Sequence, residues 1–130
     1  MDSKEKSLLF VRLARDRRAK NLTLLDLRGF IFYADYFVIC SGRSDRQVQA
    51  IAEYIQTKLR EYKMRPRSVD GVSAGRWVLM DYGDVIVHIF QQPVRDFYDL
   101  EGLWSDAPQV PLPPDPEESE EWEDSFEDAE

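Results

Sequence analysis

The clearest pattern of hydrophobic and polar positions along the chain lies between residues 44 and 62. Five apolar residues recur there at intervals of three and four, which places them on one face of a helix. They are Val48, Ile51, Ala52, Ile55 and Leu59. Ser44 and Gln47 have the spacing of a capping box, so the helix is predicted to begin at Asp45. Pro66 stops its continuation.

Residues 4–19 carry a second helical pattern, in which leucines and valines alternate with arginines. This pattern is typical of an amphipathic helix with a basic outer face. A solvated face is the favoured interpretation of those arginines. We expect the helix to pack its apolar side against a sheet.

Shorter apolar runs predict strands. Residues 21–27 form one strand that Gly29 ends, and residues 67–72 hold a short, weak strand. Residues 35–40 are apolar at nearly every position, as in an interior strand that helices cover on both faces. Residues 77–80 and 85–90 form a hairpin, with Gly83 available for a positive φ in the turn. Pro93 opens a short helix that runs towards Trp104, because proline is well tolerated at a first helical position.

This order of elements predicts one α/β domain over residues 1–107, with a mixed sheet of about five strands and helices packed over it. The composition changes after Trp104, and residues 107–116 hold five of the seven prolines. We expect disorder from about Asp106, and we take residues 108–130 as a proline-rich and then acidic tail. Trp122 and Phe126 could dock on a basic partner as a transient helix, although a solubilising tail is the favoured interpretation.

The charge of the chain is unevenly distributed. The net charge is −8, but residues 115–130 contain ten acidic residues and no basic ones. Residues 1–114 therefore hold 17 basic and 15 acidic residues, and the predicted domain is close to neutral. Neither part shows the dense basic patch of a dedicated nucleic-acid site.

The single cysteine, Cys40, excludes an internal disulfide, and its apolar neighbours indicate a buried and inert thiol. No apolar run has the roughly 20 residues that a membrane span needs. The first ten residues lack the features of a signal peptide. We expect a cytoplasmic protein without a membrane partner.

Two groups of residues are candidates for chemistry. The turn from Ser41 to Ser44 lies between a strand and a helix, where free N–H groups can attract a phosphate. A glycine turn and an N-cap explain the same residues and are favoured. Nucleotidyl transfer would also need an Asp-x-Asp pair for two metal ions, and the sequence has none. Asp81 and Asp84 have the spacing of turn-forming carboxylates.

The only histidine, His88, shares a strand face with Ile86 and Phe90. A buried core histidine is the favoured interpretation, because no recognisable nucleophile or orienting motif accompanies it. The sequence therefore predicts no enzyme, no cofactor and no metal site.

A binding surface explains the segment from Trp77 to Trp104 better, because large aromatic side chains are interspersed there with carboxylates. Aromatic anchors and acidic neighbours suit a basic protein partner. For Trp77 and Phe97, a place in the core is an equally good interpretation. The predicted contact residues are Trp77, Met80, Asp81, Tyr82, Asp84, Tyr98, Leu100, Leu103 and Trp104. We expect Asp81→Lys or Asp84→Lys to weaken binding while the fold stays intact.

The segments ADYFVICSGRSDRQVQAIAEYI (34–55) and GRWVLMDYGDVIVHIFQQPVRDFYDLEGLW (75–104) resemble the Iojap family of ribosomal silencing factors, RsfS. LLDLRG at 24–29 fits the family's first strand, and the resemblance extends from about Leu8 to Ala107. Met80 stands where leucine is usual, and the acidic tail is not part of the family pattern.

The resemblance implies a nucleotidyltransferase-like fold that lacks the metal-binding acids. It implies binding to the large ribosomal subunit through ribosomal protein L-fourteen, which blocks joining of the small subunit and represses translation. Alternatives are a large-subunit assembly factor, a nucleotide-binding enzyme of nucleotidyltransferase type, and an adaptor whose aromatic surface buries itself in a homodimer.

Overall fold

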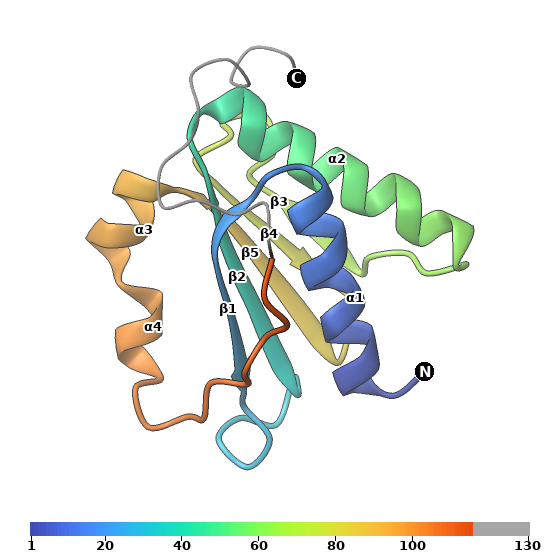
Figure 1. The fold of residues 1–130 in the computed structure, drawn as a ribbon, viewed down its shortest axis with the longest axis vertical. Coiled ribbons are helices and arrows are strands. Elements are labelled where there is room, and N and C mark those ends of the chain that lie inside the picture. The colour runs from blue at the N-terminus through green and yellow to red at the C-terminus, as the bar shows by residue number, and fades with distance from the viewer. Residues whose placement is uncertain (116–130) are drawn as a thin grey trace.

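The computed structural model describes residues 1–115 as one five-stranded mixed sheet with helices on both faces (Figure 1). The strands follow the order β1-β2-β5-β4-β3. In chain order the elements are α1 (Ser3–Asp16), β1 (Lys20–Asp26), β2 (Tyr36–Gly42), α2 (Asp45–Glu61), β3 (Ser68–Asp70), β4 (Trp77–Asp81), β5 (Val85–Gln91), α3 (Gln92–Tyr98) and α4 (Leu100–Leu103). The predicted α/β class and the mixed sheet of five strands are confirmed.

The centre of the sheet is the parallel pair β2 and β5, and the other three pairings are antiparallel. All seven residues of β2 are buried, as expected for an interior strand with helices on both faces. The parallel pairing needs a long crossover, which α2 and the hairpin partner β4 supply. Helix α2 is the first part of this crossover, and it begins directly after the turn that follows β2.

Helices α1 and α2 cover one face of the sheet and enclose the larger core (Figure 1). Alternate strand residues point into it, among them Val38 and Cys40 of β2 and Val78 and Met80 of β4. Burial raises the pKa of the Cys40 thiol to about 12. The predicted buried and inert cysteine is therefore confirmed.

Helix α2 begins at Asp45, as predicted, and Ser44 caps it by accepting a hydrogen bond from the Gln47 amide at 3.1 Å. The capping box is incomplete, because the Gln47 side-chain oxygen accepts from the amide of Arg43 at 2.7 Å and not from Ser44. The same Gln47 side chain donates to the carbonyl oxygens of Arg17 and Arg18 at 3.3 and 3.2 Å. Gln47 thus ties the end of α1 to the start of α2.

Helix α1 ends three residues earlier than predicted. Arg18 has a φ of 62°, and the Ala19 amide returns to the Ala14 carbonyl at 3.1 Å. This left-handed ending satisfies the last carbonyls of the helix. The sequence pattern continued to residue 19 because arginine and alanine are good helix formers, which hid the end.

The segment after Trp104 differs from the expectation. The amide of Asp26 donates to the Pro108 carbonyl, and the Val110 amide donates to the Leu24 carbonyl, at 2.9 and 2.8 Å. Ala107 is buried, and Val110 packs against the larger core. The disorder expected from about Asp106 is therefore wrong for residues 106–115, of which 108–110 pair with β1 and Pro113 and Asp115 contact Arg15 of α1. The expected disorder of residues 116–130, and the docking of Trp122 and Phe126, fall outside the described residues.

Among residues 1–115, no helix is both long enough and apolar enough to cross a membrane.

Candidate docking surface

The second face of the sheet is only half covered. Helices α3 and α4 pack over it through Val94, Leu100 and Trp104, with α3 in contact with β2 and β5. Strand β4 lies beyond them, and Trp77 and Leu79 are its residues on this face. Because side chains alternate along a strand, Val78 and Met80 point to the opposite, helix-covered face.

The aromatic side chains on this half-covered face touch one another in a continuous series. Trp104 meets Phe37 edge to face, with ring centroids 6.2 Å apart, and Phe37 lies 4.7 Å from His88. Trp77 stacks on Phe90 at 4.7 Å. The ring centroid of Tyr98, the last residue of α3, lies 5.1 Å from that of Trp77, so the series extends from the sheet to this helix. Such offset and edge-to-face pairs add to the stability gained by burial alone.

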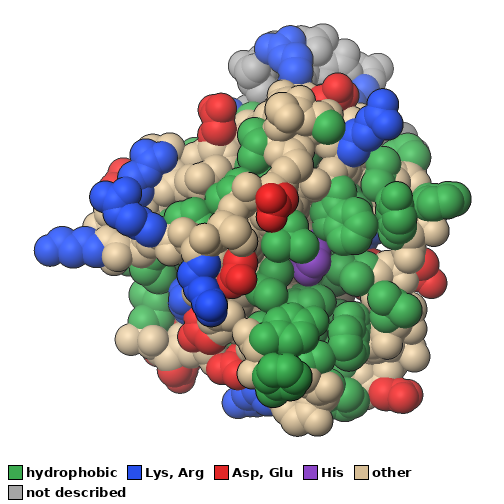
Figure 2. Space-filling model, turned by 180° about the vertical axis from the view of Figure 1, so that it is seen from behind, with side chains coloured by type: hydrophobic (Ala, Val, Ile, Leu, Met, Phe, Trp, Pro, Cys, Tyr) green, Lys and Arg blue, Asp and Glu red, His purple; other side chains and the backbone are tan. Residues whose placement is uncertain are grey.

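Part of this series and its neighbours remain open to solvent. Tyr98 is 55% exposed, and Phe97, whose ring centroid lies 5.1 Å from that of Tyr98, is 80% exposed. Leu103 of α4 is 73% exposed, and Trp77 and Leu79 are partly exposed. Figure 2 shows this side of the molecule, with hydrophobic side chains gathered around the single histidine. We call this surface the aromatic face; its residues are Phe37, Trp77, Leu79, His88, Phe90, Phe97, Tyr98, Leu100, Leu103 and Trp104. A contiguous apolar surface of this kind is a candidate site of protein association.

His88 belongs to the aromatic face but is only 3% exposed, among the rings of Phe37, Trp77 and Phe90. Its Nδ1 accepts a hydrogen bond from the indole nitrogen of Trp77 at 3.2 Å. Burial lowers the pKa of His88 to about 4, so the imidazole is neutral at neutral pH. The predicted buried core histidine is confirmed, and its observed role is to hold the Trp77 ring.

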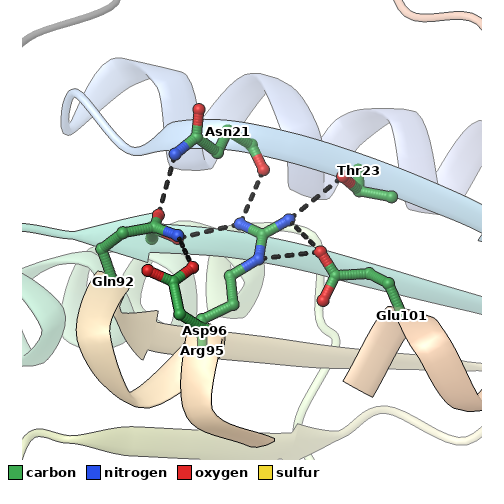
Figure 3. A network of polar contacts seen from close by, with 7 residues as sticks. Asn21, Thr23, Gln92, Arg95, Asp96 and Glu101 are labelled. Atoms are coloured by element: carbon green, nitrogen blue, oxygen red, sulfur yellow. Dashed lines mark hydrogen bonds and ion pairs between the residues drawn. The ribbon is translucent and has the colours of Figure 1, made fainter. Parts of the chain in front are cut away.

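Arg95 fixes α3 and α4 over the sheet (Figure 3). Its buried guanidinium donates to the Asn21 carbonyl at 2.7 Å and to the hydroxyls of Ser41 and Thr23 at 2.8 and 3.1 Å. Its Nε and Nη2 donate to one oxygen of Glu101 at 2.9 and 2.7 Å. One side chain therefore joins β1, β2, α3 and α4.

The predicted single helix after Pro93 is broken into α3 and α4. Asp99 stands at the break with φ 48° and ψ 54°, and its amide donates to the Arg95 carbonyl at 2.8 Å. Asp and Asn tolerate this left-handed conformation better than most residues. The break turns the chain so that Glu101 faces Arg95 and Leu103 faces solvent.

The two hairpin carboxylates hold the local structure, as turn-forming residues do. Asp81 accepts from the amide of Gly83 at 2.8 Å, and Gly83 has a φ of 91°. Asp84 pairs with Lys6 of α1 at 2.6 Å, and Lys6 also donates to the Tyr82 carbonyl at 2.8 Å. Replacing either carboxylate by lysine would therefore disturb a structural contact as well as the surface charge.

The structure brings five of the nine predicted contact residues together and places the other four elsewhere, two at the end of the hairpin and two in the core. Trp77, Tyr98, Leu100, Leu103 and Trp104 all belong to the aromatic face. Asp81 and Asp84 lie at the end of the hairpin and are partly exposed. Met80 is fully buried and Tyr82 nearly so, and both side chains pack in the core under α1 and α2. Neither offers a surface to a partner, so the prediction of contact is wrong for these two residues.

Sequence reasoning missed Phe37, Leu79, Phe90 and the anchoring role of Arg95. Strict alternation from Trp77 along β4 would have placed Leu79 beside it and Met80 on the other face. Phe97, for which core and surface were equal interpretations, is an exposed residue. The contacts of Arg95 join positions 21, 23, 41 and 101, and no local sequence pattern predicts that meeting.

The turn from Ser41 to Ser44 is explained by packing. A Cβ at Gly42 would lie 3.0 Å from a methyl of Val48 and 3.2 Å from its amide nitrogen, so glycine allows the close approach of α2. The amides of Arg43, Gln47 and Val48 have partners within the protein, which are Gln47 Oε1, Ser44 Oγ and the Ser44 carbonyl. Residues 1–115 also contain no group of three or more His, Cys, Asp or Glu side chains placed to hold a metal ion.

The fold and this surface together define a small α/β protein with one half-open, aromatic sheet face. The chain belongs to the family described as ribosomal silencing factor during starvation, RsfS, which it matches over residues 1–130. It is 44% identical to ribosomal silencing factor RsfS of Bacillus subtilis over 83% of this chain and 93% of that protein. It is 30% identical to mouse mitochondrial assembly of ribosomal large subunit protein 1, over 75% of this chain and 44% of that protein.

Solved structures agree with the fold. A crystal structure of a Bacillus halodurans protein superimposes with a TM-score of 0.76 at 37% identity, covering 85% of this chain and all of that one. A protein of Chromobacterium violaceum, CV0518, gives a TM-score of 0.79 at 36% identity, covering 81% of this chain and 88% of that one. The resemblance to the Iojap family and to its fold is thereby confirmed.

Proposed function

We propose that this protein is a ribosomal silencing factor that binds the large ribosomal subunit through ribosomal protein L-fourteen. Bound there, it obstructs the approach of the small subunit and lowers translation. The observation that carries the proposal is the aromatic face, where Trp77, Tyr98 and Leu103 are open to solvent on a rigid sheet and helix frame. Membership of the silencing-factor family supports an action on the ribosome.

The mechanism is steric and needs no reaction. Aromatic anchors on a rigid support bind with little loss of conformational freedom, and the surrounding contacts exclude water. Carboxylates lie at the border of the aromatic face, with Asp81 on the same side of β4 as Trp77, and Asp96 and Asp99 exposed around α3. They would orient a basic ribosomal protein and speed its encounter with this surface. The proposal accordingly includes no catalytic activity, no cofactor and a cytoplasmic location.

The experiment that tests this function is sedimentation of purified large subunits through a sucrose gradient with the protein added. We expect the protein to travel with large subunits and the fraction that joins small subunits to fall. The proposal fails if the protein stays at the top of the gradient, or if it binds large subunits without affecting joining. Sizing of the free protein at several concentrations separates this case from a homodimer that buries the aromatic face.

Two exposed tyrosines provide a matched pair of variants for the same gradient. Tyr98 is 55% exposed on the aromatic face, and Tyr62 is 45% exposed at the end of α2. Tyr98→Ala should weaken binding to large subunits at least about tenfold, the effect of losing a central aromatic anchor. Tyr62→Ala should bind like the unchanged protein. Equal binding by both variants would place the contact elsewhere on the molecule.

A second candidate function is assembly of the large subunit, which the name of the mouse relative favours. Both functions need the same contact with the large subunit. The two functions differ in the stage at which the protein acts, because an assembly factor acts on immature large-subunit particles and a silencing factor acts on mature ones. Adding the protein to mature subunits and measuring their joining therefore separates silencing from assembly.

A further inference from the structure

The loop between β1 and β2 carries three exposed aromatic side chains within four residues. Phe30 is 46% exposed, Phe32 99% and Tyr33 52%. We call these three residues the aromatic tip. Figure 1 shows the loop at the end of the sheet where β2 begins, far from the start of α2. Phe32 has the largest exposed fraction among the large hydrophobic side chains of residues 1–115, so its ring contributes almost nothing to the core.

The backbone of this loop is held by hydrogen bonds. The Leu27 amide donates to the Asp35 carbonyl at 2.8 Å, which closes the base of the loop. The amides of Phe30 and Ile31 both donate to the Leu27 carbonyl, at 2.9 and 3.2 Å. The Asp35 amide donates to the Asp84 carbonyl at 2.7 Å and joins the loop to the β4–β5 hairpin. The loop is therefore preorganised, and little conformational freedom would be lost when it binds a partner.

Two other side chains of the loop point inward and connect it with the aromatic face. Ile31 packs against the hydrophobic cluster that contains Phe37 and Phe90, and Ala34 is a buried member of that cluster. Phe37 and Phe90 are also residues of the aromatic face. The aromatic tip therefore adjoins the aromatic face at the end of the sheet, so one large partner can cover both.

The surroundings of the aromatic tip are acidic. They comprise residues 2–6 at the start of α1, residues 26–35 and residues 81–84 of the hairpin, which hold six acidic and three basic side chains, a net charge of −3. Two of the three basic side chains are engaged in ion pairs. Lys6 lies 2.6 Å from Asp84, and Arg28 lies 2.7 Å from Asp26. This end of the molecule therefore favours a positively charged partner.

The charge distinguishes the classes of partner that bind exposed aromatic side chains. Nucleic acids stack their bases on aromatic rings, but their phosphates need basic side chains nearby. Membrane interfaces also take up aromatic rings, and their anionic lipids attract basic segments. An acidic surface suits neither of them. A basic protein with an apolar cleft suits both the rings and the charge.

We propose that the aromatic tip, with Phe32 at its centre, docks in an apolar cleft of a basic protein of the large ribosomal subunit, beside the surface that the aromatic face binds. The inference rests on the proposed function, because it takes the large subunit as the partner. The tip is a second anchor, and it prevents the bound protein from rotating about the first contact. A fixed orientation is what a steric block of the small subunit requires.

Replacement of Phe32 tests whether the tip is an anchor. Phe32→Ala should weaken binding to large subunits about tenfold, as expected for loss of an aromatic anchor. The fold should be retained, because this side chain is 99% exposed, and thermal unfolding of the free variant checks this. Tyr62→Ala is the control, because Tyr62 is also an exposed aromatic residue, at 45%, but lies at the end of α2.

Phe32→Glu and Phe32→Lys form a matched pair that identifies the class of partner. Both variants remove the ring and add one charge at the same exposed position. Against a basic protein, Phe32→Glu should bind large subunits more tightly than Phe32→Lys. The difference should shrink between about 0.1 M and 1 M salt, as the Debye length falls from about 10 Å to about 3 Å. Tighter binding by Phe32→Lys would assign the tip to ribosomal RNA and overturn the proposal.

A photo-reactive analogue of phenylalanine, p-benzoyl-phenylalanine, in place of Phe32 identifies the contact directly. The full-length chain with this analogue is irradiated together with purified large subunits. We expect a crosslink to a ribosomal protein, at a segment in which Lys or Arg residues flank apolar ones, as mass spectrometry of the crosslinked peptide would show. The same analogue in place of Tyr62 should give no crosslink.

Failure of this inference can be distinguished from failure of the proposed function. If the unchanged protein stays at the top of the gradient, both fail. If it travels with large subunits and Phe32→Ala binds equally well, only the docking of the tip is excluded. The same holds if the analogue at position 32 crosslinks to RNA, to a second copy of this chain or to nothing. Binding to anionic phospholipid vesicles that is lost in Phe32→Ala would assign the tip to a membrane surface and likewise overturn the inference.

Discussion

The indole N–H of Trp77 donates to Nδ1 of His88 across the β4–β5 pair, at 3.2 Å. Because Nδ1 accepts, the proton of the neutral imidazole is on Nε2. Protonation of His88 would put a second N–H opposite the indole and remove the bond. The orientation of the largest side chain on the aromatic face therefore depends on one histidine remaining neutral.

This relationship predicts an acid-sensitive stability. The folded pKa of His88 is about 4 and the ordinary value is 6.5. Between these values the unfolded chain binds the proton and the native protein does not. Stability should therefore fall as the pH drops from about 6.5 to about 4, by up to about 3 kcal/mol for a shift of this size. Urea unfolding at a series of pH values measures the change.

His88→Asn is the control for this pH effect. The asparagine amide oxygen can accept from the Trp77 indole but does not titrate. The variant should be less stable at every pH, because it leaves a cavity, and its stability should change little between pH 6.5 and 4. The hydrogen bond with Arg28 lowers the pKa of Asp26 from its ordinary value of 3.8. The stability that this carboxylate contributes is therefore lost only below about pH 3.8, outside the range from pH 6.5 to 4 in which His88 acts. An unchanged slope in His88→Asn would contradict the assignment.

Arg95 predicts a large loss of stability on replacement. Arg95→Met removes the donors that join Asn21, Ser41 and Thr23 and leaves the partly buried Glu101 without its partner. Loss of one member of a buried charged pair costs about 3–5 kcal/mol, and partial exposure of Glu101 places the expected loss near about 3 kcal/mol. Denaturant unfolding measures it. Arg95→Met with Glu101→Met should recover part of the loss, and an equal loss in single and double variants would show that the two charges are not coupled.

Asp81 allows the charge of the hairpin end to be tested without disturbing the turn. Asp81→Asn keeps a side-chain oxygen for the Gly83 amide but removes the negative charge. If the carboxylate steers a basic partner, association with large subunits should slow by roughly two- to tenfold at low salt, with little effect on dissociation. Stopped-flow or surface-immobilised binding at two salt concentrations measures this. A change confined to the dissociation rate would mean that Asp81 makes a direct contact.

Two glycines with positive φ allow the energetic cost of a steric clash to be separated from the cost of the backbone conformation alone. Gly75 has a φ of 69°, and a Cβ there would lie 2.9 Å from the Asp45 carbonyl oxygen at the start of α2. Gly83 has a φ of 91°, and a Cβ there would meet nothing nearer than 3.9 Å. Gly83→Ala should cost about 1–2 kcal/mol for the backbone alone. Gly75→Ala should cost about 1–3 kcal/mol more, because the loop must move away from α2. Thermal unfolding of both variants decides the comparison.

Local patterns predicted those parts of the fold that depend on neighbouring residues. The apolar spacing from Val48 to Leu59 and the cap at Ser44 placed α2, and Gly83 placed the hairpin turn. The break at Asp99 was not predicted, because no glycine or proline marks it and Asp99 takes a left-handed conformation.

The sequence predicted several of the residues of the candidate site but not how the fold arranges them. Trp77, Tyr98 and Leu103 were placed correctly on one surface, since large side chains crowded into a short segment cannot all be enclosed. Met80 was misplaced because it alternates with Trp77 along β4 and so points to the opposite face. Tyr82 was misplaced because it follows the end of β4, where alternation does not tell which way a side chain points. The partners of Arg95 could not be predicted, because they come from strands distant in sequence.

Residues 107–113 were predicted to be disordered because a proline-rich composition is typical of disorder. Their position along β1 determines how the sheet ends on that side. The outer edge of β1 would otherwise expose backbone donors and acceptors to any extended chain. The Pro108 carbonyl accepts from the Asp26 amide, and the Val110 amide donates to the Leu24 carbonyl, so these edge groups are already paired. Pro111 and Pro113 lack the N–H that would pair with a further strand. The sheet is thereby terminated on that side by a segment that cannot be extended. Within residues 1–115, the one sheet edge that then remains open to an intermolecular β-sheet is the three-residue strand β3, on the opposite side.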